Sequence, residues 1–192
     1  MSGFTRHRRS RLVIANFTGF EADLLRSLAA QLVELLRNEE AAPHGQDPLE
    51  AMMDFSGPTS APEDPVLARL FPTAYSDDEE SAAEFRRFTE ATLRDGKARA
   101  ACTIIDGLEE AGLPAQLEEE GLMIDVELDE PTAETWMRSF TDLRLALATR
   151  LGVEEDDEAY WEAMPDDDPR AQAHDIYDWV GYLQETLVRA LA

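Results

Sequence analysis

Two segments of this chain share one order: a short strand, a helix cap and a long amphipathic helix. From Leu122 to Leu128 every second residue is aliphatic and the residues between are mostly acidic, which is the pattern of a strand with one buried face. Arg11–Phe17 is rich in β-branched and aromatic residues and predicts another strand. Each strand has an apolar face to bury. We therefore predict a mainly α domain whose two strand–helix units form a small two-stranded β-sheet.

Both strands lead into capped helices. Thr18 and Glu21 have the spacing of a capping box, so we expect a helix from there to about Asn38. Asp129 caps a second helix, which has proline in its first turn and continues to Leu151. The leucines of the first helix recur at steps of three and four residues and give it one apolar face.

The middle and the end of the chain predict further helices. Asp64 and Pro65 begin a short helix that Pro72 closes. We expect the other helices over about 77–94, 97–111, 155–164 and 171–191, with a break at Gly96. In the helix over 77–94 the inward candidates are Phe85, Phe88 and Leu93, and its cap is Ser76 or Asp77.

The composition fits one domain. The chain has 192 residues, of which 44% are hydrophobic, enough to bury a core without disulfides. We expect a basic flexible arm over 1–10 and one helical domain over 11–192. The domain includes a loop near 39–64, with a short helix around Leu49–Phe55. A single cysteine and the lack of a long apolar run favour a cytoplasmic protein without a membrane span.

Charge is distributed unevenly along the chain. The chain has 41 acidic and 17 basic residues, which gives it a formal net charge of −24. The first eleven residues contain no acidic residue and four arginines: Arg6, Arg8, Arg9 and Arg11. The acidic body repels phosphate backbones and attracts basic protein surfaces. The arm is the segment suited to an anionic partner such as DNA, and a solvating tail is the alternative interpretation.

Motifs for catalysis and metal binding are absent from the sequence. It has no nucleophile elbow, zinc-protease motif or phosphate-binding glycine loop, and its three histidines are far apart along the chain. We predict no enzyme activity, no metal and no cofactor. An enzyme with a site dispersed among carboxylates stays an alternative, as does a structural dimer without a ligand.

An acidic run over 154–168 is a candidate docking face. Its residues are mostly Asp and Glu, with two aromatic residues among them, and aromatic side chains often anchor interfaces. A solvated surface, with the aromatic residues packed in a short helix, is the alternative. The candidate residues are Glu154, Glu155, Asp156, Asp157, Tyr160 and Trp161.

Cys102 is the redox candidate. It lies in an apolar stripe of the helix over 97–111, where cysteine is commonly inert and buried. Lys97 and Arg99 lower its pKa if the thiol reaches the surface. The neighbouring basic cluster of Arg86, Arg87, Arg94, Lys97 and Arg99 is explained either by an anionic partner or by ion pairs within the helices.

Several blocks of the sequence resemble an actinobacterial family long carried as a domain of unknown function. They are 64–72, Ala74–Tyr75, 83–89, 142–147 and 149–152, and the resemblance extends from about Arg11 to Leu151 and beyond. Some members are described as oxidative-stress transcriptional regulators.

The resemblance implies a cytoplasmic regulator that contacts the transcription machinery, through a sigma factor or RNA polymerase. DNA then takes part only indirectly or through the basic arm, and a homodimer stays open. Because Cys102 is alone, a sensor based on an internal cysteine pair does not fit this chain.

Overall fold

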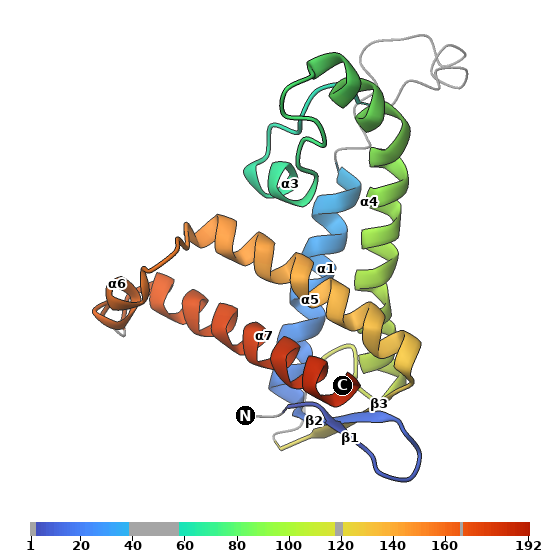
Figure 1. The fold of residues 1–192 in the computed structure, drawn as a ribbon. Helices are drawn as coiled ribbons and strands as arrows, with labels where there is room; N and C mark the ends of the chain where they lie inside the picture. Colours follow the sequence, from blue (N-terminus) through green and yellow to red (C-terminus); the bar gives the residue numbers. More distant parts are fainter. Residues whose placement is uncertain (1–2, 39–57, 118–120, 166) are drawn as a thin grey trace.

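The computed structural model describes residues 3–38, 58–117, 121–165 and 167–192. These form six helices and one three-stranded sheet (Figure 1). The strands are β1 (Thr5–Arg6), β2 (Val13–Thr18) and β3 (Met123–Leu128). The helices are α1 (Gly19–Asn38), α3 (Pro65–Leu70), α4 (Glu79–Glu110), α5 (Glu130–Leu151), α6 (Glu158–Glu162) and α7 (Pro169–Leu191). The mainly α prediction is confirmed.

The two predicted strands are neighbours in the sheet. β2 and β3 pair antiparallel, with Val13 opposite Leu128 and Phe17 opposite Ile124. These four side chains are buried on one face of the sheet, as the alternation of β3 predicts.

The sheet has a third strand, so the two-stranded prediction was wrong. β1 pairs antiparallel with β2 at the edge of the sheet. The preceding Phe4 is buried and packs edge-on against the rings of Phe17 and Trp136. Its backbone N–H also donates to Oγ1 of Thr186 on α7, at 3.1 Å. Residues 4–6 are therefore part of the folded domain, where the sequence predicted a flexible arm, because one apolar side chain fixes them to the core.

Capped turns join both strands to their helices. The Thr18 N–H donates to a Glu21 carboxylate oxygen at 2.9 Å, and the Glu21 N–H donates to the Thr18 hydroxyl at 3.2 Å. This reciprocal pair is the predicted capping box. At the second junction, Asp129 accepts from the Thr132 N–H at 2.9 Å. Because β2 and β3 are antiparallel, the two junctions lie at opposite ends of this strand pair, and α1 and α5 begin there (Figure 1).

The helices pack as two pairs that cross. α1 lies beside α4 and α5 lies beside α7, and α5 also contacts α4 and α3 (Figure 1). Trp136 of α5 is fully buried at the crossing with α4, where its indole N–H donates to the Thr103 carbonyl at 3.1 Å. A Cβ on Gly107 would lie only 2.8 Å from the Trp136 ring. Glycine at this position therefore allows α4 and α5 to approach closely.

The predicted break at Gly96 is wrong, because α4 is one continuous helix over Glu79–Glu110. In an unbroken helix the residues that face the core recur with one periodicity along its whole length. The buried Ala98, Ala101 and Leu108 therefore determine which face of α4 packs on the core. The same face in the first half of α4 carries charged residues. Phe85 and Phe88, expected to point inward, are therefore 43% and 66% exposed.

The remaining boundaries are close to the predictions. Asp78 caps α4, one residue after the nearer expected cap, by accepting from the Ser81 N–H at 3.0 Å. Asp64 caps α3 as predicted, and α5 ends at Gly152, whose φ of 72° is left-handed. The short helix predicted around Leu49–Phe55 lies outside the described residues.

Candidate interaction surfaces

The arginines of the N-terminal segment lie in the β-hairpin that β1, β2 and the residues between them form. Arg6 lies in β1, where it is 3.7 Å from Glu130 and donates to the Leu191 carbonyl at 3.5 Å. Arg8, Arg9 and Arg11 are exposed in the turn that follows, and none has an acidic side chain within 4.0 Å among the described residues. We call these three residues the hairpin arginines.

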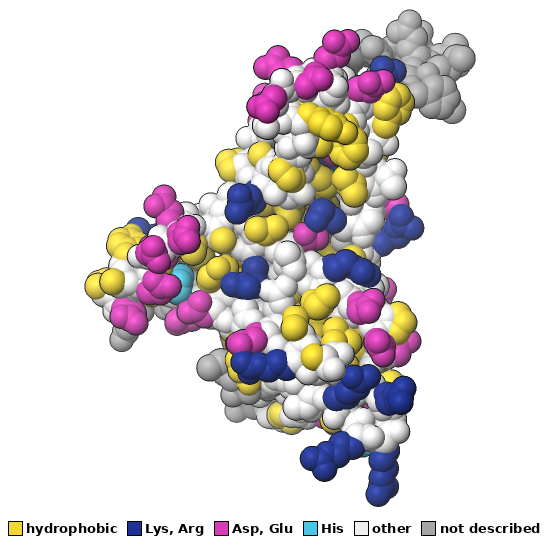
Figure 2. Space-filling view, in the orientation of Figure 1, with side chains coloured by type: hydrophobic (Ala, Val, Ile, Leu, Met, Phe, Trp, Pro, Cys, Tyr) yellow, Lys and Arg dark blue, Asp and Glu magenta, His cyan; other side chains and the backbone are white. Residues whose placement is uncertain are grey.

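The hairpin turn is ordered by its own hydrogen bonds. The His7 N–H donates to the Leu12 carbonyl at 2.8 Å, and the Arg11 N–H donates back to the His7 carbonyl at 3.1 Å. The Ser10 hydroxyl lies 2.8 Å from Nδ1 of His7. The end of the molecule that carries the sheet therefore presents basic side chains (Figure 2), which is the arrangement that an anionic partner needs.

The predicted acidic docking face is brought together around α6. Its acidic side chains cluster there in Figure 2, and Tyr160 is 53% exposed. Trp161 points the other way: its buried ring stacks on His174 of α7 at 4.4 Å. Its indole N–H donates to Asp157 at 2.7 Å. Trp161 therefore attaches α6 to α7, while the Tyr160 hydroxyl accepts from Arg170 of α7 at 3.0 Å.

The Asp157 carboxylate has a structural role. It accepts from the Glu154 N–H at 2.8 Å as well as from the Trp161 indole. The Glu154 N–H, and after it the Trp161 indole, hold the pKa of Asp157 below its ordinary value of 3.8. Asp157 is thus ionised at neutral pH and holds the turn that precedes α6.

Cys102 is half-buried, and its surroundings differ from the predicted ones. Lys97 and Arg99 are engaged elsewhere, at 2.6 Å from carboxylates of Asp142 and Asp95. Among the basic side chains that the structure describes, Arg37 of α1 is the one in contact with the sulfur: its Nη2 lies 3.9 Å from Sγ of Cys102. The thiol packs against the core, and the chain has no second cysteine with which to pair.

The central basic cluster is explained mainly by ion pairs within α4. Glu90 accepts hydrogen bonds from Arg86 and from two nitrogens of Arg94, at 3.0 and 2.8 Å for the latter. All three side chains are buried. The spacing of arginine, glutamate and arginine at four-residue steps was the sequence signal for this buried network, and our assignment of the inward face missed it.

Beside this network, the end of α3, the loop that follows it over 71–74 and α4 form an apolar groove of about 280 Å³, which we call the α3–α4 groove. Arg86 donates to the carbonyl of Phe71 at 3.1 Å, and the Arg94 guanidinium lies 4.9 Å from the centre of the Phe71 ring. The buried network thus fixes the floor of the groove. The lining residues are Leu70, Phe71, Pro72, Thr73, Ala74, Ala82, Phe85, Arg86, Thr89, Glu90 and Leu93.

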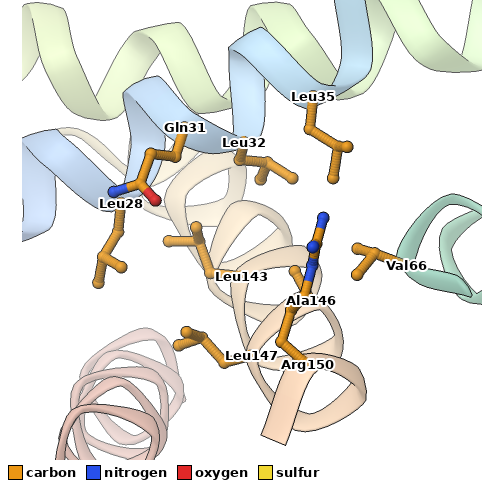
Figure 3. A pocket seen from close by; sticks show the side chains of 9 residues that line it. All are labelled: Leu28, Gln31, Leu32, Leu35, Val66, Leu143, Ala146, Leu147 and Arg150. Carbon is orange, nitrogen blue, oxygen red and sulfur yellow. The ribbon is translucent and has the colours of Figure 1, made fainter. Parts of the chain in front are cut away.

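A second hollow, of about 350 Å³, lies between α1, α3 and α5 (Figure 3). Leucine and other aliphatic side chains form most of its wall, and its polar lining residues are Gln31 and Arg150. Arg150 is already 3.3 Å from a carboxylate oxygen of Asp64. The described residues that line this hollow include no carboxylate, histidine or thiol.

Neither a metal site nor a membrane-spanning helix is found in the described part of the chain. No three His, Cys, Asp or Glu side chains there are grouped so that they could hold a metal ion. No described helix is long and apolar enough to cross a membrane.

Comparisons with known proteins identify relatives of this chain. A protein named "Oxidative stress regulator AosR" from Mycobacterium tuberculosis strain H37Rv is 30% identical over 184 residues, which cover 89% of this chain and 78% of the relative. One from Mycobacterium leprae, named "Putative oxidative stress regulator AosR", is 33% identical over 185 residues with the same coverage. No solved structure matches the chain.

The family comparison covers nearly the whole sequence. The model of the domain of unknown function DUF2017 matches residues 1–191. The relatives are named as regulators and not as enzymes. The resemblance inferred from the sequence blocks is therefore confirmed: the chain belongs to the DUF2017 family and is related to the mycobacterial oxidative stress regulator AosR.

Proposed function

We propose that this protein is a non-enzymatic regulator of the response to oxidative stress, and that it acts by contact with the transcription machinery, through a sigma factor or RNA polymerase. The names of its relatives supply the regulatory role. The observation that carries the protein-contact mechanism is the net charge of −24. Such a surface is repelled by DNA at long range and attracts basic protein surfaces.

The distribution of charge supports an indirect role for DNA. The described structure exposes acidic side chains around α6 and at the start of α4, while the hairpin arginines lie at the sheet end of the molecule (Figure 2). Three arginines supply few phosphate contacts, which makes binding weak and sensitive to salt. In our proposal, the hairpin arginines contact DNA only when a partner protein has brought this chain to it.

The proposed regulation does not include an internal disulfide. The chain has one cysteine, which is half-buried against the core. In our proposal, a signal from an oxidant reaches this chain through its partner or through Cys102, which the oxidant converts to a sulfenic acid or whose thiolate exchanges with a disulfide of another molecule and releases a thiol.

A pull-down from cell extract tests the proposal. The tagged protein is immobilised, and the retained RNA polymerase subunits and sigma factors are identified with and without oxidant. Retention of a sigma factor or polymerase subunit is the expected result. If neither is retained, the proposal is wrong, and its alternatives are favoured: an enzyme with dispersed carboxylates or a structural dimer. Measuring the size of the purified protein in solution distinguishes these two alternatives.

A further inference from the structure

The α3–α4 groove has a wall of exposed apolar side chains. Phe85, Thr89 and Leu93 follow one another at four-residue steps along α4, so they form one stripe. Phe85 is 43% and Leu93 49% exposed. Tyr75 packs edge-on against Phe85 with ring centres 5.9 Å apart and extends the wall. A contiguous exposed patch of this kind typically marks an interaction site.

The groove is formed before any partner binds. Its floor at Phe71 is held by Arg86 and Arg94, which are themselves bound to the buried Glu90. A partner that enters the groove therefore does not have to order it. Preorganised surfaces of this kind lose less conformational entropy on binding, which favours affinity.

Exposed acidic side chains lie at the start of α4, just before the lining residue Ala82 in the chain. Five exposed acidic residues and one exposed basic residue, Arg87, lie between Asp77 and Phe88. In Figure 2, acidic side chains lie next to the hydrophobic side chains at this end of the molecule. Hydrogen bonds from Ser81 hold the pKa of Asp78 below its ordinary value, which keeps it ionised at neutral pH. We call the four of these residues at the start of α4 the acidic rim: Asp77, Asp78, Glu79 and Glu80.

We propose that the α3–α4 groove binds a basic amphipathic segment of a partner protein. Apolar side chains of that segment enter between α4 and the loop that follows α3, and its lysines or arginines face the acidic rim. Charge complementarity selects this occupant. A second copy of this chain, at a net charge of −24, would bring like charges together. The inference rests on the proposed function and deepens it, because it names the surface and the chemistry of the partner.

Fluorescence anisotropy of a labelled amphipathic peptide made of leucine and lysine tests the groove. The double variant Phe85→Ser and Leu93→Ser removes two wall side chains that are about half exposed, so its melting temperature should match the wild type. We expect it to bind the peptide about tenfold more weakly or worse, since such side chains are typical anchors. Phe20→Ser is the matched control: Phe20 is 71% exposed at the start of α1, at the sheet end of the molecule.

A charge reversal tests the rim separately. Asp77→Lys with Glu79→Lys should weaken peptide binding and reduce its dependence on salt. The matched control is Glu109→Lys with Glu110→Lys, which changes the charge equally at the exposed C-terminal end of α4 and should leave more of the affinity. A peptide of the same composition, scrambled so that it has no apolar face, should bind weakly to every variant.

Three results would overturn the inference. They are equal binding of both peptides, equal loss in the groove and control variants, and a wild-type dimer in sedimentation that Phe85→Ser with Leu93→Ser dissociates. The last would assign the groove to a second copy. These outcomes are distinct from failure of the proposed function, in which the wild type binds the peptide through the groove but retains neither sigma factor nor polymerase.

Discussion

The Glu90 carboxylate is the centre of the buried network that fixes the α3–α4 groove. It is 2% exposed and accepts from Arg86 and Arg94, which are 7% and 6% exposed. Replacing Glu90 with alanine leaves two buried guanidinium groups close together without the negative charge between them. Removal of one member of a buried ion pair typically costs about 3–5 kcal/mol of unfolding free energy. We expect Glu90→Ala to lose stability in that range.

Urea unfolding followed by circular dichroism measures this loss, with the midpoint and slope compared between variants. Asp95→Ala is the matched control, because Asp95 pairs with Arg99 at the same four-residue spacing in α4 but on its exposed face. Exposed pairs of this kind contribute about 0.3–0.5 kcal/mol. A Glu90→Ala variant that loses no more stability than Asp95→Ala would refute the reasoning that the network holds α4 to the loop after α3.

Three further predictions concern other sites. Replacing the hairpin arginines Arg8, Arg9 and Arg11 with alanine should reduce retention of the purified protein on DNA at low salt, and unchanged retention would remove the hairpin from any contact with DNA. Native Cys102 should react with a thiol reagent much more slowly than after denaturation, because it packs against the core; equal rates would show an open thiol. Hydrogen bonds from Thr132 lower the pKa of Asp129 from 3.8, so its contribution to stability is complete above that value and is lost as the pH falls below it. The difference in melting temperature between wild type and Asp129→Asn, whose side chain does not titrate, should therefore shrink from pH 5 to lower pH, and a constant difference would contradict this.

The two strand–helix units could be predicted because their signals are local. The alternation in β3 and the capping box at Thr18 depend on residues within a few positions of one another. β1 could not be predicted in this way. Its two residues are in the sheet because Phe4 packs against side chains far away in the sequence, among them Trp136.

The groove was missed because the wrong residues of α4 were expected inside. Aromatic side chains are usually buried and charged ones exposed, which favoured Phe85 and Phe88 over Arg86 and Glu90. The structure reverses this order, since the arginines and the glutamate satisfy one another. If the helical pattern had been continued through Gly96, it would have predicted the face of α4 that is in fact buried, because a single glycine does not end a helix.

Direct binding to purified transcription components tests the central claim of a regulator that works by protein contact. The protein is immobilised, and RNA polymerase core, the holoenzyme and free sigma factors are passed over it at physiological salt. We predict binding of at least one of them, weakened by Phe85→Ser with Leu93→Ser and unchanged by Phe20→Ser. Absence of binding by every component, with and without oxidant, would contradict the account.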